Sequence, residues 1–163
     1  TSDVLAHLLH EHQVGFVDRA VKATYDVRGA LVKGEAKAEI AKHAGILLRY
    51  LLFADEAPMP EGGVEGDSAL KTHFLNHARK TAQGVSLREF DLRTRLFKYR
   101  CSYMVHSYAF SGLPALLKRQ VLTDLHTALD RSKQSPVSSH LHVTEKMAIN
   151  HILRTTLKGY RGD

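Results

Sequence analysis

The stretch SLREFDLRTRLFKYRCSYMVHSYAF, residues 86–110, decides how the rest of the chain is interpreted. It contains the only cysteine, three of the six tyrosines, three of the six phenylalanines and five basic residues. Ser86 and Glu89 have the spacing of a capping box, in which the two side chains hydrogen-bond free backbone N–H groups at the start of a helix. Val85 and Phe90 have the spacing of the accompanying hydrophobic staple. The pattern predicts a helix that begins at Ser86.

Two apolar stripes run along this predicted helix. One consists of Leu87, Phe90, Thr94, Phe97, Cys101, Met104 and Tyr108, and the other of Leu92, Leu96, Tyr99, Tyr103, His106 and Phe110. Two stripes predict burial on two sides, which is typical of a helix at the centre of a fold. On this interpretation Cys101 is a buried, inert thiol rather than a nucleophile.

Apolar residues recur with a helical period in five further segments. We expect helices over residues 4–31, 35–53, 68–83, 114–130 and 144–158. The acidic, Pro- and Gly-containing segment 54–67 is expected to be an exposed loop. No segment predicts a strand. The sequence therefore predicts an all-α fold, a single helical domain over residues 1–163 formed by an irregular bundle of about six helices around a central helix near 86–110.

Composition narrows the possible classes of protein. One cysteine excludes an internal disulfide framework and Cys-rich zinc or iron–sulfur sites. No apolar run reaches the length of a membrane span, so we expect a soluble chain. Phosphate-binding glycine loops and the nucleophile and zinc-protease motifs are absent, which favours a non-enzymatic role.

The net charge of +6 is concentrated in the middle of the chain, where residues 68–133 hold twelve bases and four acids. Five of these bases lie on or beside the solvent face of the predicted central helix, namely Arg88, Arg93, Arg95, Lys98 and Arg100. Such a face could bind an acidic protein partner, or nucleic acid through its phosphates. The tyrosines lie on the apolar stripes instead of between the arginines, which favours a protein partner over a stacking platform for bases.

Eleven histidines are many for 163 residues. Three pairs of possible metal ligands have the i,i+4 spacing that places both side chains on one helix face, and they are His7 with Glu11, His73 with His77, and His126 with Asp130. A metal site needs at least one further ligand from elsewhere in the fold. These pairs predict, as an alternative function, binding of iron, zinc or haem, whereas the interaction hypothesis requires no cofactor.

The paired ligands are similar to those of the hemerythrin-like oxygen-binding bundles. That resemblance implies two irons held by such pairs on neighbouring helices, although here His7 and Glu11 occupy the first helix, where that family has an isolated histidine. Among the other histidines, His106 lies on an apolar stripe and is expected in the core. Solvated positions are expected for His10, His12, His43, His140 and His142.

A second resemblance covers residues 85–157. The runs SLREFDLRTRLFKYRCSYMVHSYAFSGLP and VTEKMAINHILRTT resemble the C-terminal helical part of large uncharacterised bacterial proteins, some of which carry c-type cytochrome motifs upstream. The resemblance implies an accessory subunit, or a C-terminal portion, that packs in a larger redox or envelope assembly. The leading hypothesis is therefore a non-enzymatic helical interaction subunit that binds an acidic partner through its basic surface.

Overall fold

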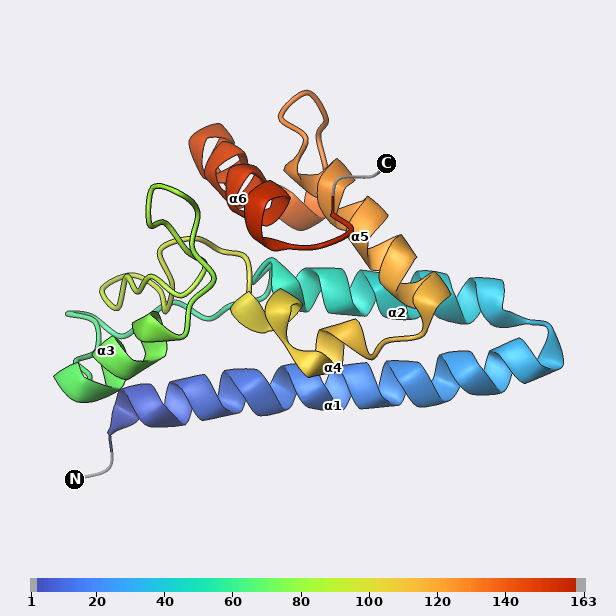
Figure 1. The fold of residues 1–163 in the computed structure, drawn as a ribbon, viewed down its shortest axis with the longest axis horizontal. Helices are drawn as coiled ribbons and strands as arrows, with labels where there is room; N and C mark the ends of the chain where they lie inside the picture. The colour runs from blue at the N-terminus through green and yellow to red at the C-terminus, as the bar shows by residue number, and fades with distance from the viewer. Residues whose placement is uncertain (1–2, 161–163) are drawn as a thin grey trace.

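The computed structural model describes residues 3–160 and confirms the all-α prediction. Figure 1 shows two long antiparallel helices at the base of the molecule, with the shorter elements packed on them. The six α-helices within the described residues are α1 (Val4–Lys33), α2 (Ala36–Leu51), α3 (Ser68–Asn76), α4 (Tyr108–Ser111), α5 (Ala115–Leu129) and α6 (Val143–Thr156). None of these helices is both long and apolar enough to cross a membrane.

Helices α1 and α2 form the hairpin on which the other elements are assembled. Asp3 caps α1 by accepting the N–H of Leu5 at 2.9 Å, and Gly34 ends the helix in the left-handed conformation that glycine adopts without strain. The side of α1 that faces α2 and α4 is apolar and closely packed, with Phe16, Ala23 and Val27 fully or almost fully buried. Helix α5 packs on α2, and α6 packs on α5 (Figure 1).

The predicted central helix over residues 86–110 is wrong. The capping contacts form as expected, because the N–H of Ser86 donates to Glu89 Oε2 at 2.9 Å and the N–H of Arg88 donates to Ser86 Oγ at 3.2 Å. The chain then leaves the helical path and reverses within a short hairpin. Only η1 (Tyr103–His106), a 3₁₀ turn, and the four-residue α4 give this segment helical structure.

Asp91 closes the hairpin. Its carboxylate accepts hydrogen bonds from the N–H groups of Arg93 and Thr94 at 2.8 and 2.9 Å, an arrangement that stabilises a turn instead of a helix. The N–H of Asp91 donates across the hairpin to the carbonyl of Leu96 at 3.1 Å, and that of Lys98 to the carbonyl of Glu89 at 2.9 Å. Leu92 takes a positive φ of 64° at the reversal.

The hairpin gathers the aromatic side chains that the helical interpretation had spread over two stripes. Phe90 and Phe97 form an isolated antiparallel bridge and their rings stack at 5.7 Å. Phe74 of α3 lies 5.1 Å from Phe90, and Tyr103 lies edge-on to Phe97 at 5.6 Å. Tertiary burial of these rings therefore outweighs the local preference for a helix, which is modest for Phe, Tyr, Thr and Asp.

Two smaller expectations also change. Helix α3 begins at Ser68 as predicted but ends at Asn76, well before Gly84. The loop over residues 54–67 contacts the hairpin, since the N–H of Val64 donates to the carbonyl of Leu92 at 2.8 Å. Gly63 has a positive φ of 77° next to that contact, and a side chain there would collide with the backbone of Leu92 and Arg93.

Candidate functional site

Three of the five basic residues of the predicted helix face contact groups within the molecule. The guanidinium of Arg88 lies over the rings of Phe74 and Tyr103 and donates to the carbonyl of Phe74 at 3.1 Å. Arg95 donates to two carbonyls of its own hairpin, those of Phe97 and Lys98. These contacts join parts of the segment to one another and to α3. Because residues 86–102 are not helical, the helix face predicted for these arginines does not form.

Arg100 is also used internally, in a bidentate pair with Glu145 of α6. Its Nη2 donates to Glu145 Oε2 at 2.7 Å and its Nε to Oε1 at 3.1 Å, with side chains that are only 18% and 10% exposed. Burial acts to raise the pKa of Glu145, but the hydrogen bonds from Arg100 outweigh it and lower that pKa. The pair fixes the position of the hairpin segment relative to α6.

Arg93 and Lys98 are the two predicted partner-binding residues that lie exposed. The ammonium of Lys98 is 3.5 Å from Glu89 Oε1 and 5.3 Å from the centre of the Tyr99 ring. Binding of an acidic partner or of nucleic acid by these residues stays a prediction, now reduced from five side chains to two.

Within residues 3–160, no third metal-ligating side chain joins any of the three predicted pairs. His73 and His77 are exposed neighbours with ring centres 4.4 Å apart, and His77 Nδ1 is 2.8 Å from the carbonyl oxygen of His73. His7 and Glu11 are exposed on α1. Asp130 accepts the N–H and hydroxyl of Ser132, hydrogen bonds that lower its pKa.

His126, the partner proposed for Asp130, is half-buried with its ring 5.7 Å from that of Tyr160. Among residues 3–160, three or more metal-ligating side chains come together at one other place only, formed by Asp26, Glu39 and His43. Iron, zinc or haem at the three predicted pairs therefore stays a prediction.

Two histidines expected in solvent are instead buried. His12 lies between Tyr50 and Phe53, with ring centres at 5.2 and 4.9 Å, and its Nε2 is hydrogen-bonded to Ser102 Oγ at 2.6 Å. Burial lowers the pKa of His12 to about 4. Although Ser and His are the components of a nucleophilic dyad, Ser102 is fully buried and no substrate reaches its oxygen. The contact joins α1 to the segment 86–110.

The other misplaced histidine, His43, is only 2% exposed. Its Nε2 is 2.9 Å from Asp26 Oδ2 and 3.4 Å from Glu39 Oε2. Sequence reasoning missed this cluster, although the signal was present. Residues 26 and 43 are almost equally distant from Gly34, so the hairpin of α1 and α2 places them opposite each other, and Glu39 precedes His43 by one turn.

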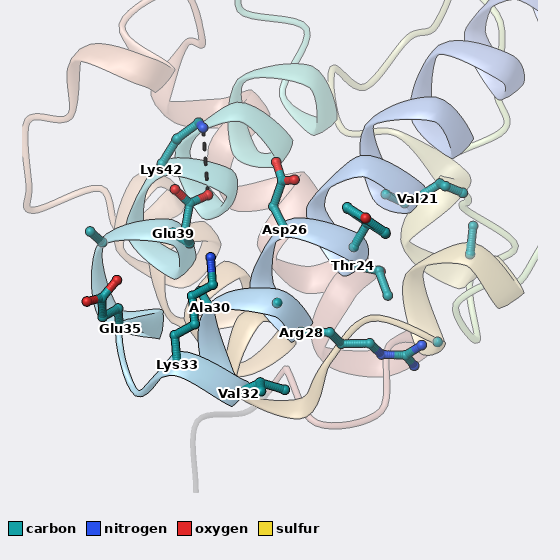
Figure 2. A pocket seen from close by; sticks show the side chains of 16 residues that line it. Val21, Thr24, Asp26, Arg28, Ala30, Val32, Lys33, Glu35, Glu39 and Lys42 are labelled. Atoms are coloured by element: carbon teal, nitrogen blue, oxygen red, sulfur yellow. Dashed lines mark ion pairs between the residues drawn. The ribbon is translucent and has the colours of Figure 1, made fainter.

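Two lysines lie on the carboxylates of this cluster. Lys22 Nζ is 3.2 Å from Asp26 Oδ2, and Lys42 Nζ is 3.6 Å from Glu39 Oε2. The hydrogen bond from Lys22 lowers the pKa of Asp26, which burial opposes and the hydrogen bond from His43 supports. Asp26, Glu39 and Lys42 line an open groove of about 1320 Å³ between the C-terminal half of α1, the start of α2 and α4 (Figure 2).

The remaining feature is an exposed apolar row on α1. It consists of Val14, Val17, Val21, Tyr25 and Val32, of which Tyr25 is 81% and Val32 91% exposed. These residues recur every three to seven positions, and a helical projection places them almost opposite the buried side of α1. We call them the outer row. In Figure 1, α1 lies along one edge of the molecule, with α2 and α4 on its inner side.

Other expectations for single residues agree with the structure. Cys101 is fully buried, and burial raises its pKa to about 12, so the thiol is inert as predicted. His106 is half-buried with Nε2 3.0 Å from Thr156 Oγ1, and burial lowers its pKa to about 4. His140, which was expected in solvent, is instead half-buried, with Nε2 2.7 Å from the carbonyl oxygen of Leu52.

Comparison with protein-family models, with curated proteins and with solved structures gave no match. The resemblances to hemerythrin-like bundles and to the C-terminal part of large bacterial proteins therefore stay predictions.

Proposed function

We propose that this protein is a non-enzymatic helical interaction subunit whose binding surface is the outer row of α1. The observation that carries the proposal is the exposure of four valines and a tyrosine along one line of a 30-residue helix. The row extends from Val14 to Val32, or about 27 Å of helix. Apolar side chains scattered singly on a surface are ordinary, but five of them on one helix face are typical of a helix–helix interface.

The two halves of α1 carry opposite charge, which favours a second copy of this chain as the occupant. Residues 3–18 contain three acids and no lysine or arginine, whereas residues 19–33 contain four bases and one acid. An antiparallel pair of α1 helices places the acidic half of each copy over the basic half of the other. A parallel pair would place like charges together, which electrostatic complementarity disfavours.

A two-fold axis near residues 17 and 18 satisfies both the charge pattern and the outer row. It brings Val14 of one copy beside Val21 of the other, and Val4 beside Leu31 and Val32. His7 and Glu11 then lie near Arg28 of the second copy, which gives this exposed pair a role as hydrogen-bonding and charged groups at the rim of the interface.

Sedimentation equilibrium tests the proposal. Wild-type protein is expected to show a monomer–dimer equilibrium, and Val21→Glu is expected to shift it to monomer because the carboxylate faces Val14 of the other copy. Leu116→Glu is the matched control, since Leu116 is an exposed apolar residue of α5 away from the outer row, and this variant should dimerise as wild type does. Circular dichroism should show that both variants keep their helical content. A monomeric wild type at submillimolar concentration would refute the proposal.

A further inference from the structure

The cluster of Asp26, Glu39 and His43 contains one polar atom whose environment is incomplete. Glu39 Oε2 is shielded from solvent and accepts no hydrogen bond from any of residues 3–160. Its neighbours, Lys42 Nζ at 3.6 Å and His43 Nε2 at 3.4 Å, are close enough for attraction but too distant for a hydrogen bond. A carboxylate oxygen removed from water without a donor is costly, and a cation in contact with it would remove that cost.

The three ligand atoms already have the spacing of a metal centre. Ligands about 2.1 Å from a zinc ion lie about 3.4 Å apart in tetrahedral geometry and about 3.0 Å apart at right angles. The observed separations from His43 Nε2 are 3.4 Å to Glu39 Oε2 and 2.9 Å to Asp26 Oδ2. All three atoms lie within 4.8 Å of one another. This spacing is compatible with one ion held among the three atoms.

We propose that Asp26, Glu39 and His43 form a binding site for a divalent transition-metal ion, with zinc as the ion that suits this ligand set. Imidazole with two carboxylates is a borderline set that zinc accepts, whereas magnesium and calcium prefer oxygen ligands alone. Water supplies the fourth ligand from the open groove that Asp26 and Glu39 line (Figure 2).

Without an ion, the ammonium groups of Lys22 and Lys42 neutralise the carboxylates of Asp26 and Glu39. Their two ammonium groups carry the same charge as one divalent ion, and their side chains are 70% and 54% exposed, so both can swing into water when the ion binds. The lysines therefore compete with the metal. This competition predicts an effect of opposite sign from that of losing a ligand, which no other role of the cluster would produce.

Titration of purified wild-type protein and its variants with Zn²⁺ in competition with a chromophoric chelator tests the site. Wild type is expected to bind one Zn²⁺ per chain. Glu39→Gln, which keeps the shape of the side chain, should weaken binding by at least about tenfold, since loss of a direct ligand exceeds the 10- to 100-fold losses seen for supporting residues. Lys42→Met should strengthen it by removing the competing charge. Glu35→Gln, which changes another carboxylate of the same groove, is the matched control and should bind as wild type.

Three outcomes would overturn the proposal. The first is a wild type that binds no Zn²⁺ at millimolar concentration. The second is equal affinity of wild type and Glu39→Gln, in a variant whose circular dichroism shows a folded chain. The third is loss of binding in His73→Ala with retention in Glu39→Gln, which would place the metal at the exposed histidine pair of α3 instead. None of these variants alters the outer row, but Val21, Tyr25 and Val32 of that row line the same groove, so the Zn²⁺ affinities are compared at one protein concentration.

Discussion

The hairpin of α1 and α2 and the segment 86–110 differ in how their sequences determine their structures and in which side chains they leave free. The hairpin follows its helical periodicity and caps, and it leaves an apolar row exposed to solvent. The segment 86–110 has the most distinctive composition, yet its aromatics are buried against one another and three of its five bases bind groups inside the molecule. The segment 86–110 therefore contributes mainly to the core, and the valines of the outer row of α1 are the better candidates for a binding surface.

This comparison predicts that changes in the segment 86–110 lower stability, whereas changes on the outer row lower association alone. The largest expected effect is that of Phe97→Ala. Phe97 is 1% exposed and contacts the rings of Phe53, Phe90 and Tyr103, so its truncation should lower the free energy of unfolding by about 3–5 kcal/mol. Urea denaturation measures the change. At a protein concentration where wild type is monomeric, Tyr25→Ala removes an exposed ring and should leave stability near that of wild type, and equal losses in the two variants would contradict the comparison.

The buried ion pair between the segment and α6 is expected to matter next. Glu145→Ala leaves the guanidinium of Arg100 partly buried without its partner and should cost about 3 kcal/mol in urea denaturation. Asp55→Ala is the control, because Asp55 makes a similar bidentate pair with Arg49 that is 50% and 70% exposed. Solvent screens that exposed pair, so its loss should change stability little. The reverse order would mean that the segment is not anchored on α6.

The buried histidine at the contact of the two regions predicts a pH dependence. The folded chain holds His12 neutral with a pKa of about 4, while the unfolded chain protonates it near its ordinary value of 6.5. Stability should therefore be highest above pH 6.5, fall as pH decreases to about 4 and level off below that, by up to about 3 kcal/mol from this residue.

The matched measurement is urea denaturation between pH 7 and pH 4 for wild type and His12→Leu. Because the leucine has no proton to take up, the variant should lose less stability over this interval. His106, whose pKa is also lowered to about 4, remains in both proteins and contributes equally to both slopes. Parallel slopes would contradict burial of His12 between Tyr50 and Phe53.

The smallest expected effect distinguishes the turn that Asp91 closes from the helix predicted over residues 86–110. Asp91→Ala removes hydrogen bonds to Arg93 and Thr94 and should cost about 1–2 kcal/mol. In a helix Asp91 would occupy the solvent face, where alanine is the better helix former, and the same change would be neutral or stabilising. The sign of the effect in thermal or urea denaturation thus decides between the two structures.

The sequence could predict the helices whose pattern is local. The caps at Asp3 and Asp67 and the glycine at 34 lie where α1 and α3 begin and where α1 ends. The error at 86–110 arose because a capping box and two apolar stripes are also compatible with a hairpin whose aromatics meet α3 and α1. Those contacts depend on residues far along the chain, such as Phe74 with Phe90 and His12 with Ser102.

The candidate sites show the same division. Spacing found histidine pairs within a helix, but the cluster that forms joins Asp26 of α1 to Glu39 and His43 of α2. It could be found only by combining the two helices with the turn at Gly34, and the assignment of His43 to solvent prevented that step. The outer row could not be recognised either, because the valines of α1 show which residues are apolar but not which side the rest of the fold covers.

Disulfide cross-linking of single cysteine variants tests the antiparallel pairing of α1 most directly. The native Cys101 is fully buried, so an added cysteine on the outer row is the thiol that reacts. Val17→Cys lies near the proposed two-fold axis and should form covalent dimers under mild oxidation. Val32→Cys should not, since two such residues would be about 40 Å apart in the antiparallel pair, although Val32→Cys mixed with Val4→Cys should form dimers. Efficient self-linking of Val32→Cys, or no linking in any variant, would contradict the account.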